Sequence, residues 1–265
     1  MWPFTKHYSI LDSGVLDGGT DWHCHILPGV DDGIRTMDSA LEVLAYYEET
    51  GIREVWLTPH IMEDVPNTPA ALRQRFAELK SAYEAQPSTV PEAQPSAGAP
   101  KIRLHLAAEN MIDTLFDRRL EAGDILTIGG PQDIPGQEGE TLLVETSYFS
   151  PPMAFEDTLV EIQMKGLHPL LAHPERYVYM EDREYERLKV TGVRFQLNLM
   201  SLVGMYGNTA ADKASYLLQA GMYDYFGSDL HRLTPWQDAI SDRVLTKKEV
   251  AALQALRARM DNPLR

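Results

Sequence analysis

Residues 21–33 read Asp-Trp-His-Cys-His-Ile-Leu-Pro-Gly-Val-Asp-Asp-Gly and overlap the end of an expected β-strand over residues 19–23. Side chains of an extended segment alternate between its two sides, so His23 and His25 point the same way and Cys24 points the other way. Two imidazoles on one side can bind one ion together. This stretch therefore indicates a metal site where a strand ends.

Further metal-competent side chains recur along the chain where hydrophobic runs stop. They are found in Thr58-Pro59-His60, at Glu109, at Glu145, in His173-Pro174-Glu175-Arg176 and in Ser228-Asp229-Leu230-His231. Packing alone gives no reason for His, Asp and Glu to collect at the ends of such runs, whereas all three bind divalent metals. The recurrence predicts a metallohydrolase.

Strand-like and helix-like segments alternate through the whole chain. Strands are expected at residues 19–23, 52–58, 102–107, 141–145, 168–172, 193–197 and 223–227. Helices are expected at residues 37–50, 69–85, 113–120, 154–165, 181–190, 209–220 and 247–260. Strands that are each followed by a helix predict an α/β fold with a parallel sheet, and the lack of a doubly-wound glycine fingerprint favours a closed barrel. In such a barrel, functional residues lie at the carboxyl ends of the strands.

The chain is expected to form a single domain over residues 1–265, because the alternation continues without a break. Residues 86–100 are rich in proline and alanine, and we expect them to form a flexible surface loop. They are not expected to link two domains.

Charge and composition exclude several classes of protein. A formal net charge of -15 argues against general nucleic-acid binding, which requires a basic surface. No apolar run approaches the roughly 20 residues of a membrane span, so the protein is not expected to be membrane-embedded. No secretory signal is evident, and a single cysteine excludes an internal disulfide and fits a reducing compartment. The predicted location is the cytoplasm.

Together, these motifs resemble those of the polymerase and histidinol phosphatase (PHP) superfamily, and more narrowly those of the bacterial CpsB/CapC-type protein-tyrosine phosphatases. The resemblance extends from about Thr20 to Asn262, with the motifs in unbroken order. It implies a distorted (β/α)7 barrel with a metal site at the C-terminal rim of the strands.

The resemblance also implies three divalent metal ions, most often manganese, with iron or zinc as alternatives. His23, His25, Glu109 and Asp229 would hold the first ion, Glu109, Glu145 and His173 the second, and Asp32, His60 and His231 the third. The four carboxylates leave two positive charges on three divalent ions, which suits a phosphate dianion. We choose Asp32 over Asp31 as the ligand by matching the motif. Asp31 is expected to support a metal ligand or to accept a hydrogen bond at a helix cap. Asp21 is expected to orient a ligand histidine.

Arg176 matches a family arginine that would contact the substrate phosphate, because a guanidinium grips pairs of oxygens. The alternative for this side chain is a surface ion pair with Glu175 or Asp182. Where the family often has a second arginine, this chain has Trp236, and Arg232 is the candidate for that role.

Two further side chains bear on the mechanism. His231 is a candidate to assist departure of the leaving group, besides binding metal. Cys24 is not expected to be a nucleophile, because the Cys-x5-Arg loop of the cysteine-dependent tyrosine phosphatases would need an arginine at position 30, which is Val30.

The resemblance implies a metal-dependent protein-tyrosine phosphatase that hydrolyses phosphotyrosine. Its expected protein partner is an autophosphorylating bacterial tyrosine kinase that regulates capsule or exopolysaccharide synthesis. Two alternatives stay open, namely a phosphatase for a small ester such as histidinol phosphate, and an inactive metal-binding regulator. Oligomerisation is left open as well.

Overall fold

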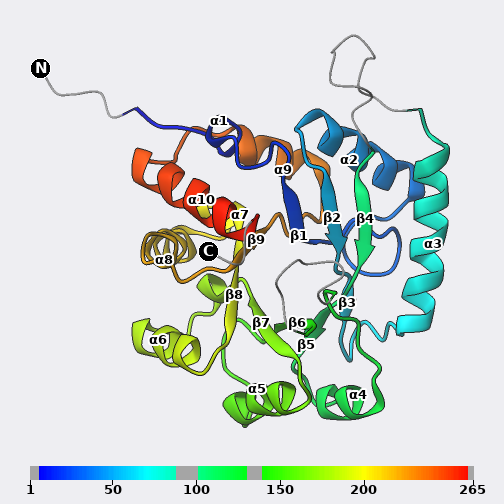
Figure 1. Cartoon of the computed structure of the whole chain (residues 1–265), viewed down its shortest axis with the longest axis vertical. Helices are drawn as coiled ribbons and strands as arrows, with labels where there is room; N and C mark the ends of the chain where they lie inside the picture. The colour runs from blue at the N-terminus through cyan, green and yellow to red at the C-terminus, as the bar shows by residue number, and fades with distance from the viewer. Residues whose placement is uncertain (1–5, 88–100, 130–138, 262–265) are drawn as a thin grey trace, which may run out of the picture.

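The computed structural model describes residues 6–87, 101–129 and 139–261, and these form an α/β fold in which helices surround a curled, parallel sheet (Figure 1). Most of the proline-rich segment expected to be flexible, residues 88–100, lies outside the described residues. In the part that is described, no helix is both long and apolar enough to cross a bilayer.

All paired strands are parallel and belong to two sheets. The first sheet has the order β1 (Thr20–Cys24), β2 (Glu54–Leu57), β4 (Arg103–Leu106). The second has the order β3 (His60–Ile61), β5 (Glu109–Met111), β6 (Thr141–Glu145), β7 (His168–Ala172), β8 (Arg194–Asn198), β9 (Tyr225–Gly227). The sheet therefore follows the order of the chain, as repeated strand–helix units predict.

The last strand returns to the side of the first. The Asp229 amide donates to the His23 carbonyl at 2.8 Å, and Cys24 forms a parallel bridge with Leu230. This approach needs a glycine at Gly227, because a Cβ atom there would lie 2.5 Å from the His23 Cβ. The chain segments that follow β1 and β9 are thus brought to one place.

Each of the seven expected strands is present, but two of them are followed by a second short strand instead of a helix. After β2 the chain passes Thr58 and Pro59 and forms the short strand β3, and after β4 it passes residues 107–108 and forms β5. Proline has no N–H to donate to a sheet, which is consistent with the break at Pro59. The expectation that a helix directly follows every strand is therefore wrong for β2 and β4.

The helices cover the outside of the curled sheet (Figure 1). They are α1 (Ile10–Ser13), α2 (Met37–Glu49), α3 (Pro69–Ala85), α4 (Phe116–Ala122), α5 (Phe155–Met164), α6 (Asp182–Val190), α7 (Leu199–Leu202), α8 (Asn208–Gln219), α9 (Leu233–Ser241) and α10 (Lys247–Met260). The sequence did not predict α1, α7 or α9. In α3, the spacing of three and four residues predicts a buried stripe of Leu72, Phe76, Leu79 and Tyr83, and all of these are buried except Phe76, which is half-buried. The Thr68 side chain caps the first turn.

Trp236 lies in α9 and is fully buried in the hydrophobic core. It packs beside Tyr47, with ring centroids 6.3 Å apart. The residue at this position is thus a core side chain and does not reach a substrate. Cys24 is also buried, and burial raises the pKa of its thiol well above the ordinary value.

Candidate metal centre

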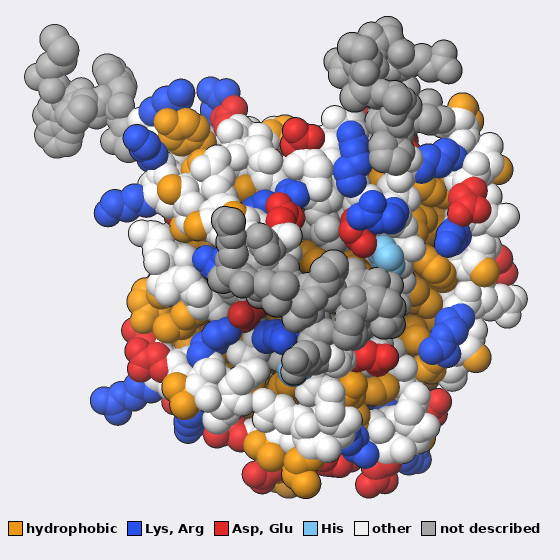
Figure 2. All heavy atoms as spheres, viewed as in Figure 1, with side chains coloured by type: hydrophobic (Ala, Val, Ile, Leu, Met, Phe, Trp, Pro, Cys, Tyr) orange, Lys and Arg blue, Asp and Glu red, His pale blue; other side chains and the backbone are white. Residues whose placement is uncertain are grey.

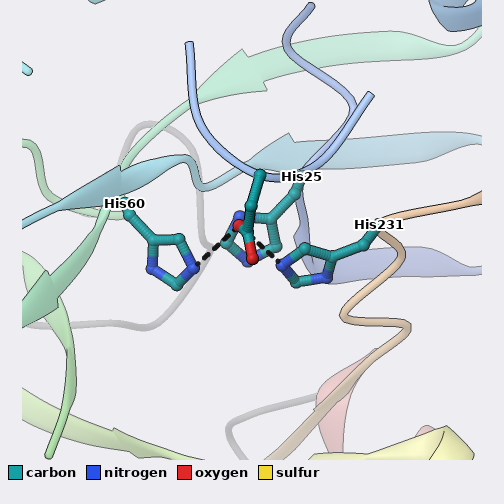
Figure 3. Close-up of side chains that lie close together, drawn as sticks. His25, His60 and His231 are labelled. Atoms are coloured by element: carbon teal, nitrogen blue, oxygen red, sulfur yellow. Dashed lines mark ion pairs between the residues drawn. The ribbon is translucent and has the colours of Figure 1, made fainter. Parts of the chain in front are cut away.

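The residues expected to bind metal meet where the strands end. His23 lies in β1, His60 begins β3, Glu109 begins β5 and Glu145 ends β6, while His173 follows β7 directly. Asp229 and His231 follow β9, and His25 and Asp32 follow β1. Figure 3 shows the rings of His25, His60 and His231 facing a common space, although they come from three segments far apart in the sequence.

The pair His23 and His25 has the geometry expected of ligands to one ion. Their Nε2 atoms are 3.1 Å apart. The Nδ1 atom of His23 lies 2.9 Å from the Gln196 Oε1, and that of His25 lies 2.9 Å from the Asp31 Oδ2. Since these oxygens accept, each Nδ1 carries a proton, so in the neutral imidazoles both Nε2 atoms present lone pairs. Two facing lone pairs favour a cation at that place.

Glu109 is the central carboxylate, and its side chain is buried. Its Oε2 lies 3.3 Å from the Nε2 atoms of both His23 and His25 and 3.1 Å from the His60 Nδ1. Its Oε1 lies 2.9 Å from the His173 Nε2. One carboxylate thus reaches four imidazoles, as a ligand shared between neighbouring ions would.

Asp229 divides its two oxygens between the histidines and the wall of the site. Its Oδ1 lies 3.3 Å from the His25 Nε2 and 3.4 Å from the His231 Nδ1. Its Oδ2 accepts from the Arg176 Nη1 at 2.8 Å and from the Asn198 Nδ2 at 2.7 Å. The backbone of Asp229 has a φ of 50°, which is strained for a residue other than glycine and is a feature of functional sites.

Three groups of potential ligand atoms result, and within each group the atoms lie within 4.8 Å of one another. The groups are His25, Asp32, His60 and His231; His23, His25 and Asp229; and His60, Glu109 and Glu145. The sequence placed His60 with only one ion, but the structure places it between two groups, because its two ring nitrogens face different carboxylates. His173 lies outside the groups and contacts Glu109 instead.

The donor set fits divalent cations. The His60 Nδ1, the Glu109 Oε2 and the Glu145 Oε1 are buried and have no hydrogen-bond partner among the described residues. Buried polar atoms are rarely left without a partner in folded proteins. All three belong to one of the three groups, so a cation there would satisfy them together. Imidazole and carboxylate donors without a thiolate suit manganese, iron or zinc.

The electrostatics of the centre lead to the same conclusion. Burial would lower the pKa of His23, but the carboxylates of Glu109 and Asp229 outweigh it and raise the pKa. Burial and His25 would lower the pKa of His60, yet Glu109 and Glu145 raise it to about 10. Burial would raise the pKa of Glu109, but His23 and His60 hold it well below its ordinary value. The carboxylates therefore create a strong preference for positive charge.

The supports of the histidines differ from the expectation. Asp21 does not orient a histidine ring; it accepts from the Ser228 amide at 2.8 Å and from the Tyr47 hydroxyl at 2.8 Å. The ring of His23 is held by Gln196, which the sequence analysis missed. A glutamine within a strand carries no sequence signal that distinguishes a supporting role from ordinary packing.

Arg176 follows His173 in a short 3-10 helix, Pro174–Arg176, and its guanidinium lies between two tyrosine rings. The guanidinium carbon is 4.4 Å from the ring centroid of Tyr148 and 3.9 Å from that of Tyr206. Such stacking holds a guanidinium in one orientation. Arg176 does not pair with Glu175 or Asp182 on the surface, because it faces the metal centre and binds Asp229.

Glu175 has a separate, structural environment. It is buried and accepts hydrogen bonds from the Ser201 hydroxyl, the Tyr223 hydroxyl and the backbone N–H of Asn198. Burial raises its pKa, against the effect of these hydrogen bonds and of His173. Through Asn198, this network connects to Asp229.

A cavity of about 430 Å³ opens over the centre. It is lined by Asp32, His60, Glu109, Tyr148, His173, Arg176, Met200, Tyr206, Asp229, His231, Arg232 and Pro235. Arg232 lines the cavity and is exposed, whereas Trp236 does not line it. Of the two positions considered for a second arginine, only position 232 borders this cavity.

The position of Gln196 leads to a prediction about metal affinity. Gln196→Leu removes the acceptor that holds the His23 Nδ1, so the imidazole can turn and change tautomer. We expect the affinity for Mn²⁺ to fall by about 10- to 100-fold, as for other supports of metal-binding histidines. Calorimetric titration of the metal-free protein with Mn²⁺ measures this. Gln219→Leu, at an exposed position on α8, serves as a matched control, and equal affinities of the two variants would contradict the prediction.

Comparison with known proteins adds an independent line of evidence. A family model described as "Capsular polysaccharide synthesis, CpsB/CapC" matches residues 19–263. Tyrosine-protein phosphatase YwqE of Bacillus subtilis is 26% identical over 216 residues, covering 80% of this chain and 77% of that protein. Tyrosine-protein phosphatase CpsB of Streptococcus pneumoniae is 24% identical over 254 residues, covering 92% of this chain and 96% of that protein.

The fold also matches a solved structure. A chain from the crystal structures of YwqE from Bacillus subtilis and CpsB from Streptococcus pneumoniae, described as metal-dependent tyrosine phosphatases, aligns with a TM-score of 0.72. The two chains are 22% identical, and the alignment covers 91% of each. At this level of identity the likeness concerns the fold, which agrees with the curled parallel sheet described above.

Proposed function

This chain belongs to the CpsB/CapC family of capsular polysaccharide synthesis, and on that basis we propose that it is a metal-dependent protein-tyrosine phosphatase. Its substrate is phosphotyrosine on a protein, and the proposed protein is an autophosphorylating bacterial kinase that regulates capsule or exopolysaccharide synthesis. One observation carries the proposal: the cavity over the carboxylate and histidine groups also has two arginines in its wall. A phosphate needs both features in a protein of net charge -15.

The proposed architecture is one domain built as a distorted (β/α)7 barrel, with the metal site at the C-terminal rim. Two features support it. Only residues 58–59 separate β2 from β3 and only residues 107–108 separate β4 from β5, so each pair can occupy one strand position. The hydrogen bond between Asp229 and His23 joins the first and last positions.

The proposed cofactors are three divalent ions, with manganese as the leading candidate and iron or zinc as alternatives. Their ligands are His23, His25, Asp32, His60, Glu109, Glu145, His173, Asp229 and His231. Three groups of donor atoms, together with the unpartnered buried nitrogen and oxygens, support this set. Bound divalent ions supply activated water near neutral pH and neutralise charge on the phosphate.

The chain's own residues bind and orient the substrate. Arg176, held between two tyrosine rings, donates N–H groups to the phosphate oxygens in an arrangement that favours in-line attack. Arg232 contacts the phosphate from the exposed side of the cavity. His231 lies beside Asp32, with 3.3 Å between its Nε2 and the Asp32 Oδ1. With its Nε2 free of metal, this imidazole can give a proton to the leaving oxygen. The phenol that leaves has a pKa near 10, so it needs less help from an acid than an alkyl alcohol does.

The proposed compartment is the cytoplasm. The chain's single cysteine, Cys24, is a free thiol buried beside the Trp56 carbonyl. A lone free thiol is compatible with a reducing environment.

Substrate preference tests the proposed function. Hydrolysis of a phosphotyrosyl peptide and of histidinol phosphate should be compared by phosphate release under identical conditions with Mn²⁺. We expect the peptide to have at least a roughly 100-fold higher kcat/KM, because its phenolate leaves several pKa units more easily than an alkoxide. A preference for histidinol phosphate would contradict the protein-tyrosine phosphatase assignment and favour a small-molecule phosphatase.

A further inference from the structure

A second cavity, which the catalytic proposal does not use, lies between the start of α5 and the helix α6. Its volume is about 620 Å³. We call it the α5–α6 groove, and it is lined by Pro151, Pro152, Ala154, Phe155, Glu156, Asp157, Tyr179, Met180, Glu184, Arg187 and Leu188. It is larger than the cavity over the metal centre, so it has room for several side chains of a ligand.

The groove shares a wall with the cavity over the metal centre. The Tyr148 ring lines that cavity, and the carbonyl of Tyr148 accepts from the Val178 amide at 2.9 Å. Tyr179, next along the chain, lines the groove, and its hydroxyl lies 2.6 Å from the Thr146 hydroxyl. The rings of Tyr148, Tyr177 and Tyr179 form a stacked series, with centroids 6.1 and 5.6 Å apart. Three stacked rings therefore connect the wall of the cavity to the wall of the groove.

The loop that leads into the groove exposes large apolar side chains. Phe149 is 79% exposed and Met153 is 95% exposed, and both lie in the loop that runs from Tyr148 to α5. At the lower edge of Figure 2, over α5, hydrophobic side chains lie next to acidic ones. Ala154, in the groove wall, has a φ of 56°, a strained conformation for alanine. Exposed apolar side chains gathered at a cavity are typical of an interaction site.

The charge of the groove specifies what can occupy it. Three carboxylates line it against one guanidinium, and Arg187 is already paired with Glu156 at 2.6 Å. Asp157 and Glu184 have no cationic partner among the residues that the structure describes. The floor is apolar, with Phe155 and Leu188 from the two helices. An occupant should therefore combine an apolar side chain with a lysine or arginine.

We propose that the α5–α6 groove binds the segment of the substrate protein next to the phosphotyrosine, and selects a segment with apolar and basic side chains. This inference rests on the proposed function and adds a docking site to it. The apolar side chain packs on the floor, and the cationic one meets Asp157 and Glu184. Each residue of an extended peptide spans about 3.3 Å, so the contacts lie a few residues from the phosphotyrosine. The groove gives a reason for acting on proteins rather than on small esters.

The test uses the full chain with Mn²⁺ and three substrates. The first is a phosphotyrosyl peptide with Leu-Lys repeats on both sides, the second carries Ser-Glu repeats instead, and the third is phenyl phosphate. Asp157→Lys reverses one exposed charge in the groove. Asp212→Lys makes the same change on α8, outside the groove, and so controls for the net charge of the protein.

We expect Asp157→Lys to lower kcat/KM for the basic peptide about three- to fivefold relative to Asp212→Lys, as for an exposed ion pair. It should raise kcat/KM for the acidic peptide and leave hydrolysis of phenyl phosphate unchanged. Equal effects of the two variants on both peptides would overturn the groove while leaving the phosphatase intact. Failure of the unaltered protein to hydrolyse even phenyl phosphate would contradict the proposed function itself, and this inference with it.

Discussion

Glu109→Gln is expected to reduce phosphotyrosyl-peptide hydrolysis by about 1000-fold, which corresponds to roughly 4 kcal/mol in the activation barrier. The amide keeps the size of the side chain but removes the negative charge that faces His23, His25, His60 and His173. No other carboxylate in the described part of the chain contacts all four imidazoles. Its loss should therefore weaken binding of more than one ion.

The measurement is kcat with saturating peptide, together with the metal content of the purified variant. Glu63→Gln is a suitable control, because Glu63 is exposed and its carboxylate accepts from the Thr114 hydroxyl away from the centre. We expect the control to retain full activity. A Glu109→Gln protein with normal metal content and normal kcat would show that the centre has been assigned wrongly.

Arg176→Lys is expected to reduce kcat/KM for the phosphotyrosyl peptide by about 100-fold, or nearly 3 kcal/mol. Lysine keeps the charge but cannot grip two phosphate oxygens at once, and it stacks less well between Tyr148 and Tyr206. The effect should appear in both kcat and KM, because the guanidinium contacts the phosphate before and during its transfer.

Steady-state kinetics with the peptide measures this effect, and Arg118→Lys provides a matched substitution. Arg118 is exposed on α4 and does not line the cavity over the metal centre, so its exchange should leave the kinetics unchanged. If Arg176→Lys and Arg118→Lys behave alike, Arg176 does not bind the phosphate, and its contact with Asp229 is structural.

The sequence predicted which candidate ligands lie close together better than it predicted the side chains that support them. His23 and His25 could be placed together from the period of a strand alone, and their Nε2 atoms are indeed 3.1 Å apart. Ligands far apart in the sequence could be grouped because strand ends meet at one edge in a parallel fold. Gln196 and Asn198 could not be found in this way. The sequence around an amide side chain in a buried strand is the same whether that side chain supports a metal ligand or only packs in the core.

The fold was predictable where periodicity is long and strong. All seven main strands and helices such as α3 were expected near their observed positions. The two-residue strand β3 was not, because so short a segment has no period, and its pairing with β5 depends on the tertiary structure. The burial of Trp236 likewise depends on α9, a helix that the sequence did not reveal, and on its contact with Tyr47.

Removal and return of metal tests the central claim most directly. The purified protein should be analysed for metal content, treated with a chelator until elemental analysis finds no divalent metal, and then assayed for phosphotyrosyl-peptide hydrolysis before and after addition of Mn²⁺. We predict that hydrolysis falls by at least about 1000-fold without metal and returns when Mn²⁺ is added. Hydrolysis at the original rate by protein shown to be free of metal would contradict a metal-dependent centre built on these histidines and carboxylates.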